Sequence, residues 1–241
     1  MVFVCLLISL LSLREFKRLL FLPSEPVLYS IFFSLLSLSL VLVLFVFRFN
    51  PLASIAVANS VFAAGMIILA RERVSNERLL KILCLGLFGF FYCVLCPWLT
   101  SQMVQLEHGS SWFLFLLAVV FFGDTFAFFG GRFFGKIKLN PSLSPKKTME
   151  GAVAGIIGSL IASLGFWAFF RPDLSLELIL VFGLLSGIIG QTGDLLMSLI
   201  KRVSQVKDSG RLLPGHGGVL DRIDGVLLVC PLIYTLAMLV H

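Results

Sequence analysis

Charged residues are scarce in this chain, and histidine and cysteine are scarcer still. Only 13% of the residues are Asp, Glu, Lys or Arg, whereas 59% are hydrophobic and occur in long runs. Such a composition is too apolar for a soluble domain and is typical of a protein that crosses the membrane several times. Three histidines and five cysteines argue against a metal site built from His and Cys ligands.

Other features that the sequence lacks exclude further kinds of protein and of binding site. No internal repeat is visible, so nothing indicates the inverted halves of a transporter. The glycine-rich loop lacks the Gly-Lys-Ser/Thr ending of a Walker sequence. Cys93 and Cys96 form a Cys-x-x-Cys inside an apolar run, which favours packing over redox chemistry or zinc binding. The net charge of +6 does not indicate nucleic-acid binding, because Lys and Arg in membrane proteins mostly record orientation.

Apolar runs alternate with polar connections along the whole chain. Most runs are long enough to cross a bilayer, so the predicted fold class is all-α: a polytopic membrane helix bundle with about seven to nine transmembrane helices. The first run, residues 1–13, is short for a span and does not look like a signal peptide. We expect one integral membrane domain over residues 1–241, with N-terminal hydrophobic helices over 1–110 and catalytic helices and cytoplasmic loops over 111–241.

Basic residues concentrate in alternate connections. Seventeen of the nineteen Lys and Arg lie in four of them, at 14–26, 71–81, 132–150 and 198–224. Because basic connections stay on the cytoplasmic side, we predict that these four face the cytoplasm. The segment 198–225 is the most polar, with nine titratable side chains, and polar groups near a bilayer are usually kept for a function.

Four carboxylates are predicted to lie near that cytoplasmic face, at Asp124, Asp194, Asp221 and Asp224. Asp221 and Asp224 are three residues apart and share a helix face. Carboxylates on one surface repel one another unless they are protonated or bridged by cations, and their oxygens suit Mg²⁺ that also binds substrate phosphates. For Asp221 or Asp224 alone, a helix cap is an equal alternative. Asp194 has glycine and apolar neighbours, which favours a functional role.

Two loops could hold phosphate groups. Lys146 and Lys147 precede a helix start at Gly151, a combination that suits phosphate oxygens. The alternative is a pair of ordinary orientation-setting lysines, with Glu150 complementing the helix dipole. The glycine-rich turn around His216 would let a ligand approach the backbone. A lone loop histidine is more often simply exposed, but the charged residues on both sides favour function here.

A long irregular pattern joins these segments. In the polar segment it comprises Ser198, Lys201-Arg202, Lys207-Asp208, Gly210, Leu213-Pro214, His216-Gly217-Gly218 and Asp221-Arg222-Ile223-Asp224. Upstream it comprises Asp124-Thr125, Gly130-Gly131-Arg132, Gly135-Lys136, Ser144 to Thr148, Glu150-Gly151 and Gly193-Asp194. Across residues 120–230 the chain therefore resembles the phosphatidate cytidylyltransferases, also called CDP-diacylglycerol synthases. Met149 and Phe126 depart from the family pattern, which often has an aromatic and a small residue there.

The resemblance implies an enzyme that condenses CTP with phosphatidate, giving CDP-diacylglycerol and pyrophosphate. It implies Mg²⁺ as cofactor, a second, monovalent cation such as K⁺, and a loop from Ser144 to Gly151 that helps to hold the nucleotide. It also implies a homodimer in a membrane of the bacterial inner-membrane type, with the active site facing the cytoplasm. The implied metal ligands are Asp194, Asp221 and Asp224.

The remaining candidates divide by their expected role. The catalytic set is Asp194, Asp221, Asp224, Lys207 and His216, with His216 as phosphate donor or leaving-group acid. Substrate-binding candidates are Ser144, Lys146, Lys147, Glu150, Lys201, Arg202, Arg222 and Asp124, the basic ones as phosphate contacts. Competing readings are a cytidylyltransferase or CTP-dependent kinase for another membrane lipid, and a cation-coupled transporter. A transporter would spread its carboxylates through the membrane depth, whereas these gather at one face.

Overall fold

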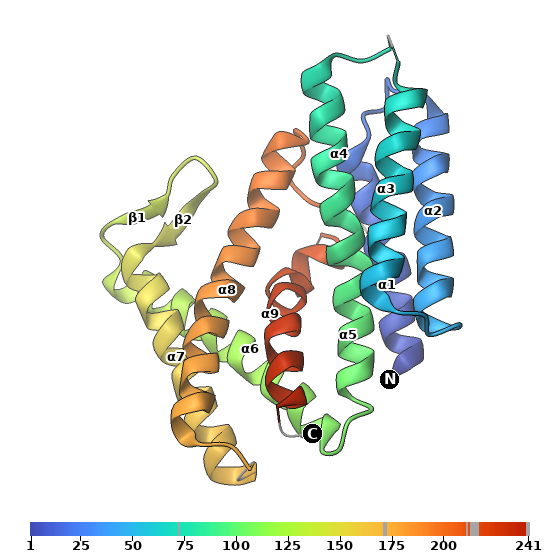
Figure 1. The fold of residues 1–241 in the computed structure, drawn as a ribbon. Helices are drawn as coiled ribbons and strands as arrows, with labels where there is room; N and C mark the ends of the chain where they lie inside the picture. The colour runs from blue at the N-terminus through green and yellow to red at the C-terminus, as the bar shows by residue number, and fades with distance from the viewer. Residues whose placement is uncertain (72, 171–172, 211, 213–216, 240–241) are drawn as a thin grey trace. The chain divides into compact units, whose positions relative to one another are not determined.

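The structure is a computed structural model that describes residues 1–71, 73–170, 173–210, 212 and 217–239. His216, a predicted catalytic residue, lies outside the described residues. The regular elements of the described chain are helices apart from one short hairpin, which confirms the predicted all-α class (Figure 1). It divides into two compact units, Met1–Ser101 with Val203–Arg222, and Gln102–Arg202 with Ile223–His241. The prediction of a single membrane domain over 1–241 stays a prediction.

Six helices of the described chain have the length and hydropathy of membrane spans, so the protein is an integral membrane protein. They are α2 (Val27–Phe45), α3 (Pro51–Leu69), the continuous helix Asn76–Met103, α6 (Gly109–Phe134), α7 (Met149–Phe170) and α8 (Leu176–Val203). The other two long helices, α1 (Val2–Leu20) and α9 (Leu220–Met238), have 19 residues each. The predicted count of about seven to nine is therefore reached if α1, α9 or both cross as well.

Helix α1 is longer than the apolar run at residues 1–13 indicated. It continues to Leu20 through Arg14, Glu15 and Arg18, which the sequence placed in a polar connection. Arg, Lys, Glu and Leu are all good helix formers, so the change from apolar to charged residues does not end the helix. As a result, these charged side chains project from a helix rather than from a loop.

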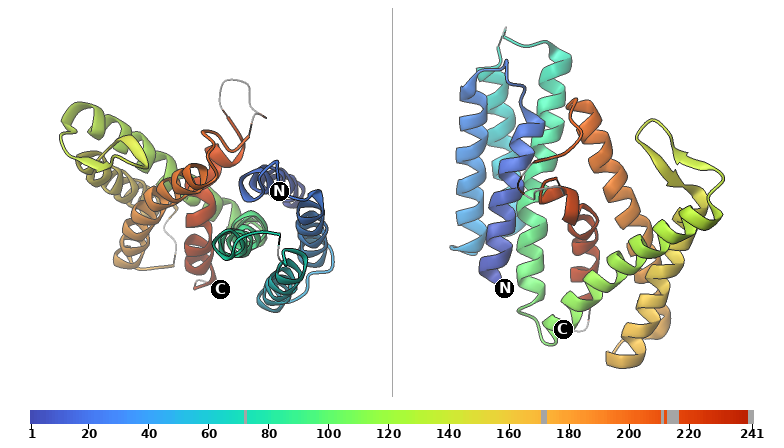
Figure 2. Two further views of the ribbon diagram at one scale, coloured as in Figure 1. Left: turned by 90° about the horizontal axis from the view of Figure 1, so that it is seen from above. Right: turned by 180° about the vertical axis from the view of Figure 1, so that it is seen from behind.

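In the first unit, α1, α2, α3 and α4 (Asn76–Phe90) stand side by side (Figures 1 and 2). Each packs against the next, and α1 also packs against α4. Phe33, Phe62 and Phe90 meet in the core with ring centroids 5.2 to 5.6 Å apart. The connection between α1 and α2 is joined to the first turn of α4 by an ion pair, in which Arg78 Nε lies 2.7 Å from Glu25 Oε1.

The span that begins with α4 contains a π-helical turn, η1 (Phe91–Leu95), before α5 (Cys96–Met103). A π turn disturbs the regular backbone hydrogen bonds of a helix. Here Ser9 Oγ donates to the Cys93 carbonyl at 2.6 Å. Cys93 and Cys96 are both fully buried thiols, in keeping with the expected packing role.

The second unit contains an element that the sequence did not predict. Within the connection 132–150, β1 (Lys138–Asn140) and β2 (Ser144–Thr148) form an antiparallel hairpin in which Lys138 pairs with Thr148. The hairpin follows α6 and leads directly into α7 (Figure 1). Lys146 and Lys147 therefore lie on a strand with defined neighbours rather than in an irregular loop.

Helices α6 and α7 approach closely through small residues. A Cβ atom added at Gly151 would lie 2.8 Å from the Ala127 carbonyl oxygen and 3.1 Å from Gly131 Cα. Small residues at such a crossing let membrane helices pack backbone to backbone. Ser159 Oγ adds a hydrogen bond to the Val119 carbonyl at 2.8 Å.

We expect Gly151→Ala to destabilise the protein by about 1–3 kcal/mol, because the added methyl meets backbone atoms that cannot rotate away. Gly165→Ala in the same helix is the matched control, since a Cβ atom there meets nothing within 4 Å. Thermal unfolding of both variants in the same detergent would compare them. A Gly151→Ala protein as stable as the control would contradict the close crossing.

Candidate functional site

A cavity of about 430 Å³ lies in the second unit, where α6, the hairpin, α7 and α8 meet. Asp124 and Arg132 come from α6, Lys146 and Lys147 from β2, and Asp194 from α8. The apolar part of the wall is Ala127, Phe128, Leu139 and Ala152. Four predicted site residues separated by up to seventy positions in the sequence, Asp124, Lys146, Lys147 and Asp194, thus line one cavity. This volume falls in the usual range of small-molecule sites.

Lys147 and Asp194 form an ion pair across this cavity. Their side chains are 27% and 40% exposed, so water and ligands can reach both groups. Such a partly exposed pair contributes little stability, and a phosphate group could replace either partner. The strand holds Lys147 in place, and the hydrogen bond from Gln191 Nε2 to the Ala152 carbonyl, 3.0 Å long, ties α8 to α7 one turn from Asp194.

Negative charge concentrates around Asp194. Asp124 and Asp224 both interact electrostatically with its carboxylate. Helices α8 and α9 are close here, because a Cβ atom at Gly193 would lie 3.2 Å from the Asp224 carbonyl oxygen. Burial, and then the Asp194 carboxylate, raise the pKa of Asp224 to about 7, although Lys201 opposes the shift. Carboxylates held this close favour a bound cation.

The donor set fits a magnesium ion that is shared with a substrate. Among the described residues, no three His, Cys, Asp or Glu side chains stand close enough to hold a metal ion alone. Asp194 and Asp224 do offer two hard oxygen donors beside lysines that suit phosphate. Mg²⁺ usually keeps several waters and binds one or two carboxylates together with substrate phosphates. A pair of this kind meets that requirement.

Asp221, the third predicted metal ligand, is a residue of the first unit. Its Oδ2 atom accepts hydrogen bonds from Ser209 N at 2.9 Å, Ser209 Oγ at 2.9 Å and Gly218 N at 3.0 Å. Gly217 has a φ of +84°, and a Cβ atom there would lie 2.9 Å from the same oxygen. Asp221 therefore organises the turn before α9. Its role as a metal ligand stays a prediction.

The other predicted residues are more scattered. The Glu150 carboxylate accepts from Ile137 N at 3.2 and 3.3 Å and so ties the start of α7 to the hairpin. Ser144 opens β2 opposite Asn140. Lys201 and Arg202 end α8, where basic side chains complement the helix dipole. Two further candidates belong to the first unit, the exposed Lys207 and Arg222.

Residues 1–240 match the model of the cytidylyltransferase family. The chain belongs to this family. Over 239 residues it is 33% identical to the phosphatidate cytidylyltransferase of Staphylococcus haemolyticus, a match that covers 94% of this chain and 85% of that protein. The match to the same enzyme of Staphylococcus saprophyticus is 46% identical over 127 residues, or 53% of this chain and 49% of that protein. The predicted family resemblance is confirmed.

A similar local match links the chain to the uncharacterized protein YnbB of Escherichia coli, at 44% identity over 130 residues. It covers 54% of this chain and 43% of that protein. The matches to the S. saprophyticus and E. coli proteins thus span about half the length of those relatives or less. The activity, substrates and partners of the whole protein are accordingly matters of proposal.

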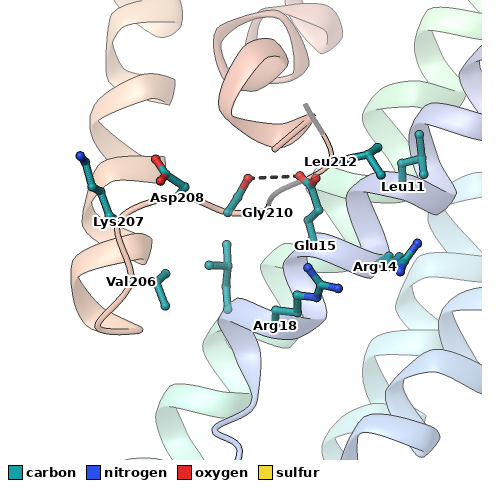
Figure 3. A pocket seen from close by; sticks show the side chains of 11 residues that line it. Leu11, Arg14, Glu15, Arg18, Val206, Lys207, Asp208, Gly210 and Leu212 are labelled. Carbon is teal, nitrogen blue, oxygen red and sulfur yellow. Dashed lines mark hydrogen bonds between the residues drawn. The ribbon is translucent and has the colours of Figure 1, made fainter. Parts of the chain in front are cut away.

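This cytidylyltransferase-family protein has a second cavity, of about 690 Å³, in its first unit (Figure 3). Arg14, Glu15 and Arg18 of α1 form one side of it, and Lys207 and Asp208 of the polar segment form another. Glu15 is only 4% exposed. The sequence did not predict a role for it, because the count of basic connections ignores acids. The available signal was a single acidic residue, Glu15, among the basic residues that follow the first apolar run.

Proposed function

We propose that the protein is a phosphatidate cytidylyltransferase, which converts CTP and phosphatidate to CDP-diacylglycerol and pyrophosphate in phospholipid biosynthesis. The observation that carries this proposal is the cavity in which Lys146 and Lys147 face Asp124 and Asp194. Basic groups for phosphates and carboxylates for a cation are the two requirements of phosphoryl transfer. The names of the staphylococcal relatives support phosphatidate as the lipid substrate.

The reaction needs little proton chemistry from the protein. A phosphate monoester is largely dianionic at pH 7, because its second pKa is about 6. A phosphatidate oxygen can therefore attack the α-phosphorus of CTP directly. The bond from the α-phosphorus to the bridging oxygen then breaks, and pyrophosphate leaves with that oxygen. The protein must bring two polyanions together in line and offset their charge.

The basic side chains of the cavity supply part of that compensation. Lys147 already points at a carboxylate of the site and can exchange it for a phosphate oxygen. Arg132 offers a planar fork suited to two phosphate oxygens, whereas Lys146 acts as a point charge. Asp194 and Asp224 would hold Mg²⁺, which would neutralise phosphate charge and stabilise the leaving pyrophosphate. Asp221 as a third ligand stays a prediction. The monovalent cation stays a prediction.

We place the active site at the cytoplasmic face of a bacterial inner membrane. Hairpin residues from the basic connection 132–150 line the cavity, and the positive-inside rule assigns that connection to the cytoplasm. CTP is dissolved in the cytosol, and the phosphate of a membrane lipid lies at the interface. A cavity at the cytoplasmic helix ends can receive both. A homodimer stays a prediction.

The test is to incubate the purified protein with CTP, Mg²⁺ and phosphatidate in mixed micelles and to measure pyrophosphate and CDP-diacylglycerol. We expect both products in equal amounts, and neither in the absence of phosphatidate. Product from another lipid phosphate, but not from phosphatidate, would instead identify a different lipid substrate. Cation flux through vesicles without nucleotide turnover would support a transporter.

A further inference from the structure

Helix α9 begins without a side chain that can cap it locally. The residue before its first helical position is Val219, which has no hydrogen-bonding side chain. The first backbone N–H groups of a helix have no partner within the helix and are usually satisfied by a nearby Ser, Thr, Asp or Asn. The start of α9 therefore needs acceptors from elsewhere.

Glu15 of α1 supplies those acceptors. Its Oε1 accepts from Val219 N at 3.0 Å, and its Oε2 accepts from Leu220 N at 3.0 Å. The residues are 204 and 205 positions away in the sequence. Both carboxylate oxygens therefore cap the helix, and the negative charge sits at the positive end of its dipole. Figure 3 shows Glu15 projecting from α1 toward the polar segment.

Two glycines enclose the carboxylate. A Cβ atom at Gly210 or at Gly218 would overlap Glu15 in each case. Since only glycine lets the backbone come this close, the segment is shaped around the acid. With 4% of its surface exposed, Glu15 has little contact with solvent, which strengthens its hydrogen bonds to the amides.

A single hydroxyl links Glu15 to Asp221. Ser209 Oγ lies 3.1 Å from Glu15 Oε2 and 2.9 Å from Asp221 Oδ2. One hydroxyl carries one proton and can donate to only one of these oxygens at a time. Asp221 also accepts from the backbone of Ser209 and Gly218. The turn before α9 is thus held by two acids from different helices.

We propose that Glu15 is a positioning residue, which fixes where α9 starts and so sets the placement of the aspartates in its first turns. This rests on the proposed function, because Asp221 and Asp224 matter only if they serve the reaction. Glu15 acts through the backbone of Val219 and Leu220 and touches no substrate. Glu15 belongs to the N-terminal helix, which lies outside the segment that resembles the family signature.

The experiment compares Glu15→Gln with wild type by hydrogen–deuterium exchange and by steady-state kinetics. Glutamine keeps the size of the side chain but presents an NH₂ group to one amide donor. We expect the peptide spanning 217–225 to exchange about 10-fold faster, while α2 and α7 stay unchanged. We also expect kcat to fall about 10- to 100-fold and the half-activating Mg²⁺ concentration to rise, because outer partners of metal ligands have effects of this size. The KM for phosphatidate stays near wild type.

Glu25→Gln is the matched control. Glu25 is another buried acid of the same unit, with 7% of its side chain exposed, and it pairs with Arg78. Its loss should lower thermal stability without changing exchange at 217–225 or the Mg²⁺ dependence. If Glu15→Gln behaves like this control, Glu15 only stabilises the fold and the proposal is wrong.

Ser209→Ala provides a second route if Glu15→Gln does not fold. It removes only the hydroxyl that joins the two acids. Exchange at 217–225 should become faster than in wild type, but by less than in Glu15→Gln. Wild-type exchange at 217–225 in this variant would overturn the proposal. Wild-type protein inactive on phosphatidate would instead refute the proposed function, whereas the exchange result would still decide whether Glu15 caps α9.

Discussion

We expect the Asp194→Asn variant to lose about 10²–10³-fold in kcat for CTP-dependent turnover, the size of effect seen when one group that stabilises transition-state charge is removed. Asp194 interacts with three charged residues of the second unit: it forms an ion pair with Lys147, and its carboxylate interacts electrostatically with Asp124 and Asp224. Asparagine keeps the shape but removes the anionic oxygen that a divalent cation needs. Release of labelled pyrophosphate by purified protein would measure the loss.

Asp173→Asn is the matched control, because Asp173 is an exposed acid of the same unit that lines neither cavity. It should turn over like wild type. Both variants should insert and elute from size-exclusion chromatography like wild type. If Asp194→Asn turns over within threefold of wild type, this carboxylate takes no part in the reaction. The cavity in the second unit is then not the active site.

Asp224→Asn should be nearly inactive and yet more stable than wild type when no Mg²⁺ is present. Burial and the Asp194 carboxylate raise the pKa of Asp224 to about 7, so the ionised form is unfavourable in the folded protein. Asparagine removes that charge and the repulsion. We expect its Tm to rise by roughly 2–4 °C, the shift that ~1 kcal/mol produces in a chain of this size.

The pH dependence of this increase in Tm provides a second measurement. An acid whose pKa is raised on folding lowers stability as pH rises from its ordinary pKa through its folded pKa. The difference in Tm between Asp224→Asn and wild type should therefore be largest above pH 7 and disappear near pH 4. Excess Mg²⁺ should reverse it by stabilising only wild type. A variant that is less stable at pH 8 without Mg²⁺ would contradict this account.

The sequence predicted the membrane class because this class depends on local composition. Apolar runs define spans, and basic residues define sides, whatever the packing. Of the predicted site residues, Asp124, Lys146, Lys147 and Asp194 line one cavity. The sequence assigned Lys147 and Asp194 to one face but did not predict their ion pair. The hairpin was missed because its strands are only three and five residues long, too short for a pattern of alternating apolar and polar residues to be recognised.

Glu15 shows what local patterns cannot provide. Among the described residues, it accepts hydrogen bonds from Ser209, Val219 and Leu220, all about 200 residues away. Nothing near position 15 indicates such partners, and the sequence placed this charged stretch in a polar connection. The same limit applies to Asp221, for which a metal role and a capping role are equally compatible with its spacing. Only the structure shows that the Asp221 carboxylate accepts hydrogen bonds from Ser209 and Gly218.

The link between Glu15 and the start of α9 also has a consequence for biosynthesis. A ribosome adds about 5–20 residues per second, so the 205 residues between Glu15 and Leu220 take roughly 10–40 s to follow. During this interval α1 is already made, but its acid has none of the backbone partners that later enclose it. Until the end of the chain emerges, water must take the place of those backbone partners. Completion of the first unit is therefore among the last events in the synthesis of this protein.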